Sequence, residues 1–197
     1  MVRNFLLLGI AVVMTSLSCA GQVVPATTHP PLSKSIGGGM DYMSGDWGRG
    51  DINRWGPTVW GTVTLWHDVS VIAEGHSMIV GGNDLASQFK YFNGGGGIVW
   101  ISDYYGRFQP LLKAEAGFAS LSHPPNGSGH LHQTSNTWTL GGGAEYHLQG
   151  RTWAHVEYDY DFFPGFHSFA TNQNNALNPR GILFGLSYRF GPYGAKY

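Results

Sequence analysis

Two segments near the end of the chain, Thr152–Phe162 and Arg180–Phe190, alternate between apolar or aromatic side chains and polar or small ones. Period-two alternation predicts β-strands with one apolar and one polar face. No window has helical periodicity, and Gly and Pro punctuate the chain throughout, so the expected fold class is all-β. Six further strands are predicted at about Lys34–Ser44, Pro57–Trp66, Val69–Ser77, Gln88–Ile101, Phe108–Leu121 and Ser135–Leu148.

The connections between these segments alternate in length. Short ones lie at residues 67–68, 102–107 and 149–151, and longer ones at Gly45–Gly56, Met78–Ser87, Ser122–Thr134 and Phe163–Pro179. Short turns at one end and long loops at the other are typical of outer-membrane barrels, with the turns in the periplasm. The pattern therefore predicts a closed antiparallel up-and-down transmembrane β-barrel of eight strands.

The first twenty residues have the composition of a secretory signal. Arg3 supplies a positive charge, Phe5–Met14 is an apolar run too short to span a bilayer as a helix, and small residues precede a cleavage position after Ala20. Lipid attachment at Cys19 is the alternative. We expect a signal peptide at residues 1–20, a Pro/Thr-rich linker at 21–33, the barrel at 34–191 and a periplasmic tail at 192–197, which Pro192 separates from the sheet.

Composition narrows the function classes. Charged residues make up 12% of the chain and the formal net charge is −1, which argues against nucleic acid as a partner. The glycine runs Gly94–Gly97 and Gly141–Gly143 are not followed by the helix that a phosphate-binding loop requires, so no cofactor is expected and the runs are interpreted as bends in strands. Cleavage after Ala20 would remove Cys19, the one cysteine of the sequence, so no disulfide is expected.

The polar face of the strands carries charges of both signs, and an unpaired charge inside a small barrel would be strongly destabilising. We expect Lys113, Arg189 and Lys90 to be neutralised by inward carboxylates, Glu74 among them, with Arg189 within pairing reach of Glu157 or Asp159. An eight-stranded barrel is only wide enough for side chains to fill it, so the lumen should be plugged rather than open. The predicted lumen charge network consists of Lys113, Glu115, Glu145, Glu157, Asp159 and Arg189.

The apolar face should point to lipid, and it includes Tyr91, Val99 and Ile101 in the fourth strand. Aromatic residues concentrate at strand ends, which favours two girdles at the headgroup level over the core aromatics of a soluble β-sandwich. The girdle candidates are Trp55, Trp60, Trp100, Tyr104, Tyr105, Phe108, Trp153, Phe162, Phe163, Tyr188 and Phe190.

Three segments carry a family resemblance: Gly141–Tyr146, His155–Tyr160 and Gly185–Phe190. With them, the chain from Lys34 to Phe190 resembles the small single-domain outer-membrane barrels of the OmpA/OmpX type. The resemblance implies a monomer in the outer membrane of a double-membrane bacterium, surrounded by outer-membrane lipid and lipopolysaccharide. It also implies that Tyr188 and Phe190 form the signal read by the barrel-assembly machinery. The family usually ends at that aromatic residue, whereas here seven more residues follow.

The residues do not favour catalysis or a metal site. His123, His130 and His132 share one loop without a completing Cys or carboxylate, so a solvated loop is expected. His167-Ser168 resembles part of the triad of lipid A deacylase barrels, but its spacing differs and no Glu follows Ser168. The expected function is therefore a non-enzymatic structural or surface-binding role through four outer loops. The alternatives are a lipid-modifying barrel enzyme and a soluble lipocalin-like barrel with an apolar cavity.

Overall fold

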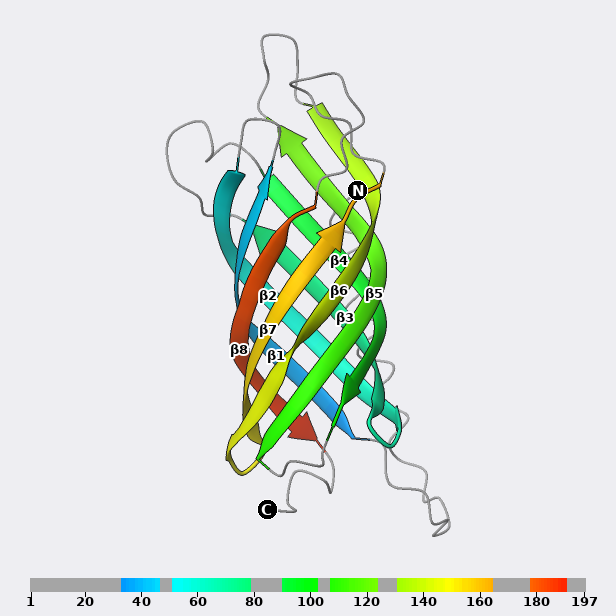
Figure 1. Ribbon diagram of the computed structural model, residues 1–197, viewed down its shortest axis with the longest axis vertical. Coiled ribbons are helices and arrows are strands. Elements are labelled where there is room, and N and C mark those ends of the chain that lie inside the picture. The colour runs from blue at the N-terminus through cyan, green and yellow to red at the C-terminus, as the bar shows by residue number, and fades with distance from the viewer. Residues whose placement is uncertain are drawn as a thin grey trace. The chain divides into compact units, whose positions relative to one another are not determined.

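The computed structural model describes residues 33–46, 51–78, 90–102, 107–123, 131–164 and 178–190. Eight strands pair antiparallel in chain order, and β8 returns to pair with β1, which closes the barrel (Figure 1). The expected fold class and strand number are confirmed. The strands are β1 Lys34–Asp46, β2 Asp51–Trp66, β3 Val69–Met78, β4 Lys90–Ile101, β5 Phe108–His123, β6 Leu131–Gln149, β7 Thr152–Phe162 and β8 Arg180–Phe190.

β1, β2, β5 and β6 extend further toward the long connections than the alternation predicts. Pairing continues to Asp46↔Asp51 between β1 and β2, and to His123↔Leu131 between β5 and β6. Much of the predicted loops Gly45–Gly56 and Ser122–Thr134 is therefore strand. The cause is that backbone hydrogen bonds between antiparallel strands need no apolar face, so a ladder runs on through polar sequence. The predicted signal, the linker before Ser33 and the tail lie outside the described residues.

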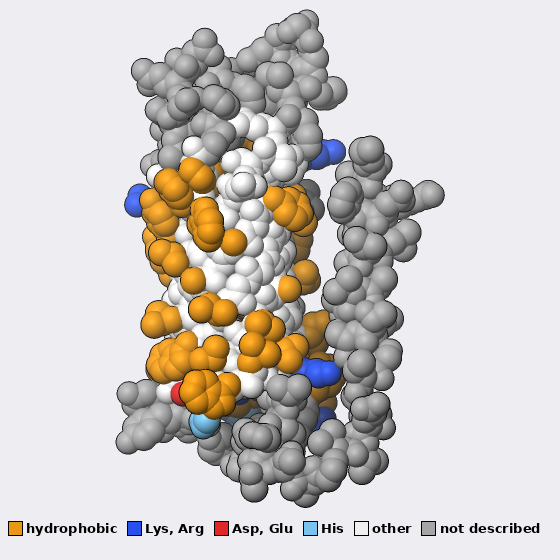
Figure 2. Space-filling view, turned by 90° about the vertical axis from the view of Figure 1, so that its right-hand side faces the viewer, with side chains coloured by type: hydrophobic (Ala, Val, Ile, Leu, Met, Phe, Trp, Pro, Cys, Tyr) orange, Lys and Arg blue, Asp and Glu red, His pale blue; other side chains and the backbone are white. Residues whose placement is uncertain are grey.

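Side chains inside the barrel are largely polar and those outside are largely apolar. Val59, Leu112 and Leu140 on the outer wall are each more than 60% exposed, while Lys113 and Glu145 in the lumen are buried. Hydrophobic side chains spread over the wall between basic side chains near its two ends (Figure 2). This polarity is that of a barrel in lipid and the reverse of a lipocalin with an apolar cavity. Within the described residues, no helix has the length and apolar composition needed to cross a membrane.

The predicted facing of β4 is wrong. Tyr91 and Val99 are buried in the lumen and Ile101 packs against inward residues, whereas Lys90 is exposed on the outer wall. Residues opposite one another on neighbouring strands point to the same side. Since Val99 lies opposite Lys113, it turns inward with it. The sequence of β4 hid this because apolar residues stand on both parities and a run of glycines separates them.

The girdle prediction holds for part of its members. Trp55, Trp100, Phe108, Phe162, Tyr188 and Phe190 are exposed on the outer wall. Trp60, Trp153 and Phe163 are buried in the lumen instead, because each falls on the inward parity of its strand; position near a strand end did not decide the face. Gly37 accommodates Trp60, whose ring lies where a Cβ at position 37 would be. Tyr104 and Tyr105 lie outside the described residues.

Two apolar clusters share the lumen with the charges. The Phe163 cluster lies near the strand ends that lead to the long connections, and it consists of Met43, Met78, Tyr91, Ala119, Leu121 and Phe163. The Trp60 cluster takes its members from β2 to β5 and from β8, and it consists of Trp60, Ile72, Val99, Leu111 and Leu183, with Ile101 against it. Charged side chains occupy the space between and beside these clusters.

A chain of ion pairs in the barrel lumen

Acidic and basic side chains alternate along one continuous series of contacts in the lumen. We call it the charge chain, and its order is Asp41, His76, Glu74, Lys113, Glu157, His155, Glu145 and Arg189. Its members come from β1, β3, β5, β6, β7 and β8. Each acid therefore touches a base on both sides, except Asp41 at the start.

The first part of the chain joins β1 to β3. His76 Nδ1 lies 2.8 Å from Asp41 Oδ2, and His76 Nε2 lies 3.0 Å from Glu74 Oε1. Glu74 stands two residues before His76 on the same strand, so both side chains point inward. All three are buried. The second oxygen of Asp41, Oδ1, has no hydrogen-bond partner.

Lys113 on β5 is the centre of the chain. Its Nζ lies 2.5 Å from Glu74 Oε2, 3.1 Å from Glu157 Oε1 and 3.3 Å from Asp159 Oδ2. Glu115 Oε1 is 3.7 Å away. The lysine side chain is fully buried, so these carboxylates replace the water that an ammonium group requires. One side chain thus connects β3, β5 and β7 across the lumen.

The last part of the chain runs toward the short turns. His155 Nε2 lies 3.0 Å from Glu157 Oε2, and Nδ1 lies 3.3 Å from Glu145 Oε1. Arg189 donates to the other oxygen of Glu145, and Ser187 Oγ donates to Glu145 Oε1 at 3.0 Å. Aromatic rings enclose this part: the Arg189 guanidinium lies 3.8 Å from the centre of the Trp153 ring, and the Trp60 ring lies 4.6 Å from that of His155.

The predicted pairing of Arg189 is wrong: the structure pairs it with Glu145 on β6, not with Glu157 or Asp159 on β7. The register explains the difference. Glu157 lies opposite Leu183, six residues before Arg189, which is roughly 20 Å along a strand at about 3.3 Å per residue. β7 and β8 are neighbouring strands, but Glu157 and Arg189 lie at different positions along the strand direction and so do not meet.

The structure brings all six predicted lumen residues into or against the charge chain. Glu115 and Asp159 contact it through Lys113, and the other four are members. The predicted network lacked Asp41 and His155, and sequence reasoning missed His76 as an inward residue altogether. The available signal was its inward parity in β3, two residues after Glu74.

A separate polar group surrounds Asp161 at the loop side of the chain. Thr139 Oγ1 donates to Asp161 Oδ1 at 2.5 Å, and Asn93 Nδ2 donates to Oδ2 at 3.2 Å. The hydroxyl of Tyr91 is 3.4 Å from the same oxygen. These donors satisfy a carboxylate that is fully buried. Tyr91 therefore links this polar group to the Phe163 cluster.

Glycine in β6 makes room for the centre of the charge chain. A Cβ at Gly141 would overlap Asp159 Oδ1, Glu157 Oε1 and Lys113 Cε. Gly142 points the other way, where a Cβ would meet Leu112 Cδ2 at 3.1 Å on the outer wall. The glycine run thus serves inward packing at one position, which gives it a structural reason in addition to bending.

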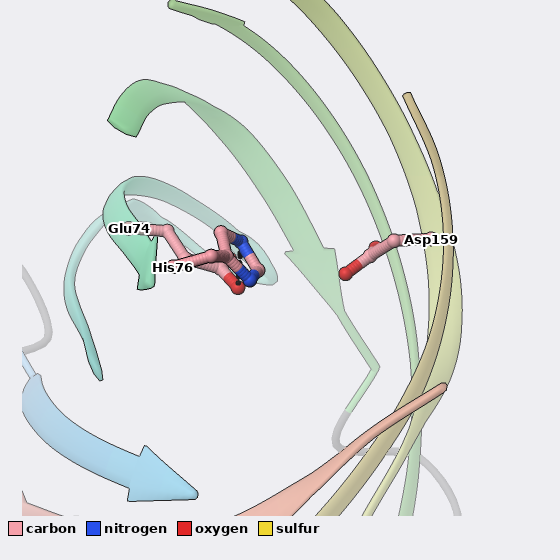
Figure 3. Close-up of side chains that lie close together, drawn as sticks. All are labelled: Glu74, His76 and Asp159. Atoms are coloured by element: carbon pink, nitrogen blue, oxygen red, sulfur yellow. Dashed lines mark ion pairs between the residues drawn. The ribbon is translucent and has the colours of Figure 1, made fainter. Parts of the chain in front are cut away.

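Glu74, His76 and Asp159 offer one donor atom each within 4.8 Å of one another, a spacing that a metal ion could use (Figure 3). Glu74 and His76 come from the same strand and Asp159 reaches toward them from the opposite wall. Lys113 Nζ, however, already contacts both carboxylates. The positive charge that these oxygens attract is thus supplied by the protein, and the group is part of the charge chain.

A closed barrel of eight strands with an apolar wall and a filled, charged lumen defines the class of small integral outer-membrane proteins. The chain matches the family model of the outer membrane protein beta-barrel domain over residues 24–190, and it belongs to that family. No curated protein matches it in sequence.

Solved structures share the fold. Neisserial surface protein A is 16% identical with a TM-score of 0.63, over 81% of this chain and 97% of that one. OprG from Pseudomonas aeruginosa is 14% identical with a TM-score of 0.56, over 82% and 97%. The attachment protein Ail of Yersinia pestis, crystallised with a heparin analogue, is 18% identical with a TM-score of 0.52, over 81% and 99%. At these identities the likeness establishes architecture and no activity.

Proposed function

We propose that this protein is a non-enzymatic outer-membrane barrel with a sealed lumen that presents its four long connections at the cell surface for a structural or binding role. The observation that carries the proposal is the charge chain, which fills the lumen with mutually bonded side chains. An open pore would need solvated charges along its wall, whereas these groups are buried and use one another as partners.

The Phe163 cluster supports the seal from the loop side. Its members converge from β1, β3, β4 and β5 and from the residue that follows β7, and their apolar side chains are buried. A layer of this kind gives a hydrated ion no partners. Burial also argues against catalysis by the lumen carboxylates, because Glu157 and Asp159 are almost inaccessible to a substrate.

Location, orientation and partners are part of the proposal. The apolar wall fits the outer membrane of a double-membrane bacterium, with outer-membrane lipid and lipopolysaccharide around a monomer. The final strand fits recognition by the barrel-assembly machinery: Tyr188 and Phe190 are exposed on the outer wall, and Phe190 lies opposite Lys34 at the closing seam. The loop residues His123, His130, His132, His167 and Ser168 lie outside the described side chains and carry no argument here.

Conductance measurement tests the seal. The purified protein is inserted into a planar lipid bilayer, and the same sample is run unboiled and boiled on a gel to establish that it is folded. The expected result is a shift in migration on boiling together with no stable single-channel steps. Reproducible open-channel steps from folded protein would contradict the sealed lumen.

Cysteine labelling tests the orientation, because the mature chain is expected to contain no cysteine. Ser128→Cys lies in a long connection and Arg151→Cys in the short turn between β6 and β7. A membrane-impermeant maleimide applied to intact cells should label the first variant and not the second, while both react after lysis. The reverse result would place the long connections in the periplasm.

A further inference from the structure

We propose that His155 is a protonation-dependent lock in the lumen. With a proton on each ring nitrogen it joins Glu145 to Glu157; with one proton fewer it releases one of them and separates the Arg189 end of the charge chain from Lys113. The inference concerns a conditional contact inside the barrel and rests on the geometry of the charge chain, so it does not depend on the role of the loops.

When both carboxylates are ionised, the geometry requires both ring nitrogens of His155 to be donors. His155 Nδ1 faces Glu145 Oε1 at 3.3 Å and Nε2 faces Glu157 Oε2 at 3.0 Å. An ionised carboxylate only accepts hydrogen bonds, and a neutral imidazole has one N–H and one lone pair. Two ionised partners can therefore be joined by one imidazole only when it is the cation.

Each carboxylate partner of His155 also contacts a fixed cation. Glu145 accepts from Arg189 through its second oxygen, and Glu157 Oε1 lies 3.1 Å from Lys113 Nζ. Ser187 also donates to Glu145, at 3.0 Å. Arginine and lysine are donors only, so the carboxylate oxygens they contact act as acceptors, as the oxygens of ionised carboxylates do. With both acids ionised, the proton that completes the bridge is on His155.

Every strand that packs around His155 contributes to the lock. β6 supplies Glu145, β7 supplies Glu157, and β8 supplies Ser187 and Arg189. β5 acts through Lys113 on Glu157. β2 places the centre of the Trp60 ring 4.6 Å from the centre of the His155 ring, at an interplanar angle of 37°. Loss of a proton would leave a ring lone pair against a buried carboxylate, and the unpaired acceptors repel one another.

The lock lies at the end of the charge chain that is nearest to solvent. Arg189, the terminal member, keeps 16% of its side chain exposed, whereas the Lys113 side chain is fully buried. The backbone N–H of Arg189 donates a hydrogen bond to the carbonyl of Arg151 in the short turn, so this end of the charge chain faces the turn side of the barrel. Protons can therefore exchange with His155 from the side that we assign to the periplasm.

Nitrogen NMR of the full chain in lipid nanodiscs tests the proposal directly. Long-range proton–nitrogen correlation spectra report on the protonation of each ring nitrogen of His155. The signals of Trp60 Nε1–H and Arg189 Nε–H report on the surroundings of that ring. At pH 6 both nitrogens of His155 should carry protons. As the pH rises to 10, one nitrogen should lose its proton, and the Trp60 and Arg189 signals should shift in the same step.

His155→Gln is the matched variant, since its amide retains one donor and the inward position. In this variant the coupled step in Trp60 and Arg189 should disappear, while the gel shift on boiling confirms folding. The proposal is overturned if one ring nitrogen of His155 is unprotonated at pH 6. It is also overturned if the Trp60 and Arg189 signals ignore the His155 step, or if that step persists in His155→Gln.

Discussion

The two histidine bridges of the lumen look alike but differ in how their ends are held. In each, an imidazole joins a carboxylate two residues away on its own strand to a carboxylate on another strand. His155 lies between acids that both touch a fixed cation, Arg189 or Lys113. In the His76 bridge only Glu74 does so, whereas among the described ion pairs Asp41 contacts His76 alone.

The difference teaches that the local motif, a histidine with an acid two residues away on its strand, does not determine how much the bridge stabilises the barrel. Histidine with an inward acid two residues away is readable from sequence in both strands. What separates the bridges is the next contact, which comes from strands distant in the chain. A bridge anchored at both ends loses several partners when one acid is removed, whereas a bridge with a free end loses fewer. The substitutions below use this contrast.

The largest loss of stability is expected for Lys113, which contacts one acid of each histidine bridge. Lys113→Met leaves Glu74, Glu157, Asp159 and Glu115 without their common cation, and an uncompensated buried charge of this kind destabilises by about 3–5 kcal/mol. Urea unfolding in lipid vesicles, followed by the gel shift, measures the change. Lys90→Met on the outer wall removes the same charge from an exposed site and should leave the unfolding midpoint in place.

Removing one acid from each bridge compares the two ends. Glu145→Gln leaves Arg189 and His155 without their carboxylate, so we expect a loss of about 2–4 kcal/mol. Asp41→Asn removes an acid whose contact in the chain is His76 alone, so about 1–2 kcal/mol is expected. Equal losses in the urea midpoints would show that anchoring by Arg189 adds nothing.

Packing at the centre can be disturbed without changing any charge. Gly141→Ala places a methyl group against Glu157, Asp159 and Lys113, and overpacking of this kind destabilises by about 1–3 kcal/mol. Gly142→Ala is the control, because its methyl group points to the outer wall, where its nearest neighbour is the flexible end of Leu112. Similar unfolding curves for the two variants would contradict the inward packing role of Gly141.

The smallest effect is expected at the exposed end of the chain. Arg189→Lys keeps the positive charge beside Glu145 but loses the flat guanidinium over Trp153, a contact that contributes about 0.5–1 kcal/mol near the surface. Tryptophan fluorescence should change in parallel with a small shift of the unfolding midpoint. A loss of stability as large as that of Glu145→Gln would mean that the shape of the guanidinium, and not its charge, dominates the contribution of Arg189.

The sequence predicts the architecture well because its strongest signal, alternation, is local. β7 and β8 have the predicted bounds, and the inward facing of Lys113, Glu145 and Arg189 follows from parity. Contacts across the lumen depend on register and barrel closure, which no single strand encodes. That is why Arg189 was assigned to the wrong acid. In β4, where apolar residues stand on both parities, even the local signal was ambiguous.

The charge chain also constrains the order of events during insertion. A hairpin that entered the bilayer alone would expose its inward face to hydrocarbon, and a single Lys or Arg at the midplane is unfavourable by about 2–4 kcal/mol. The hairpin of β5 and β6 would carry Lys113, Glu115 and Glu145 into lipid together. Apart from the contact between Lys113 and Glu115 within β5, their partners lie on β3, β7 and β8, so the full set of ion pairs forms only when those three strands have joined the sheet. Translocation and closure should therefore proceed as one cooperative step.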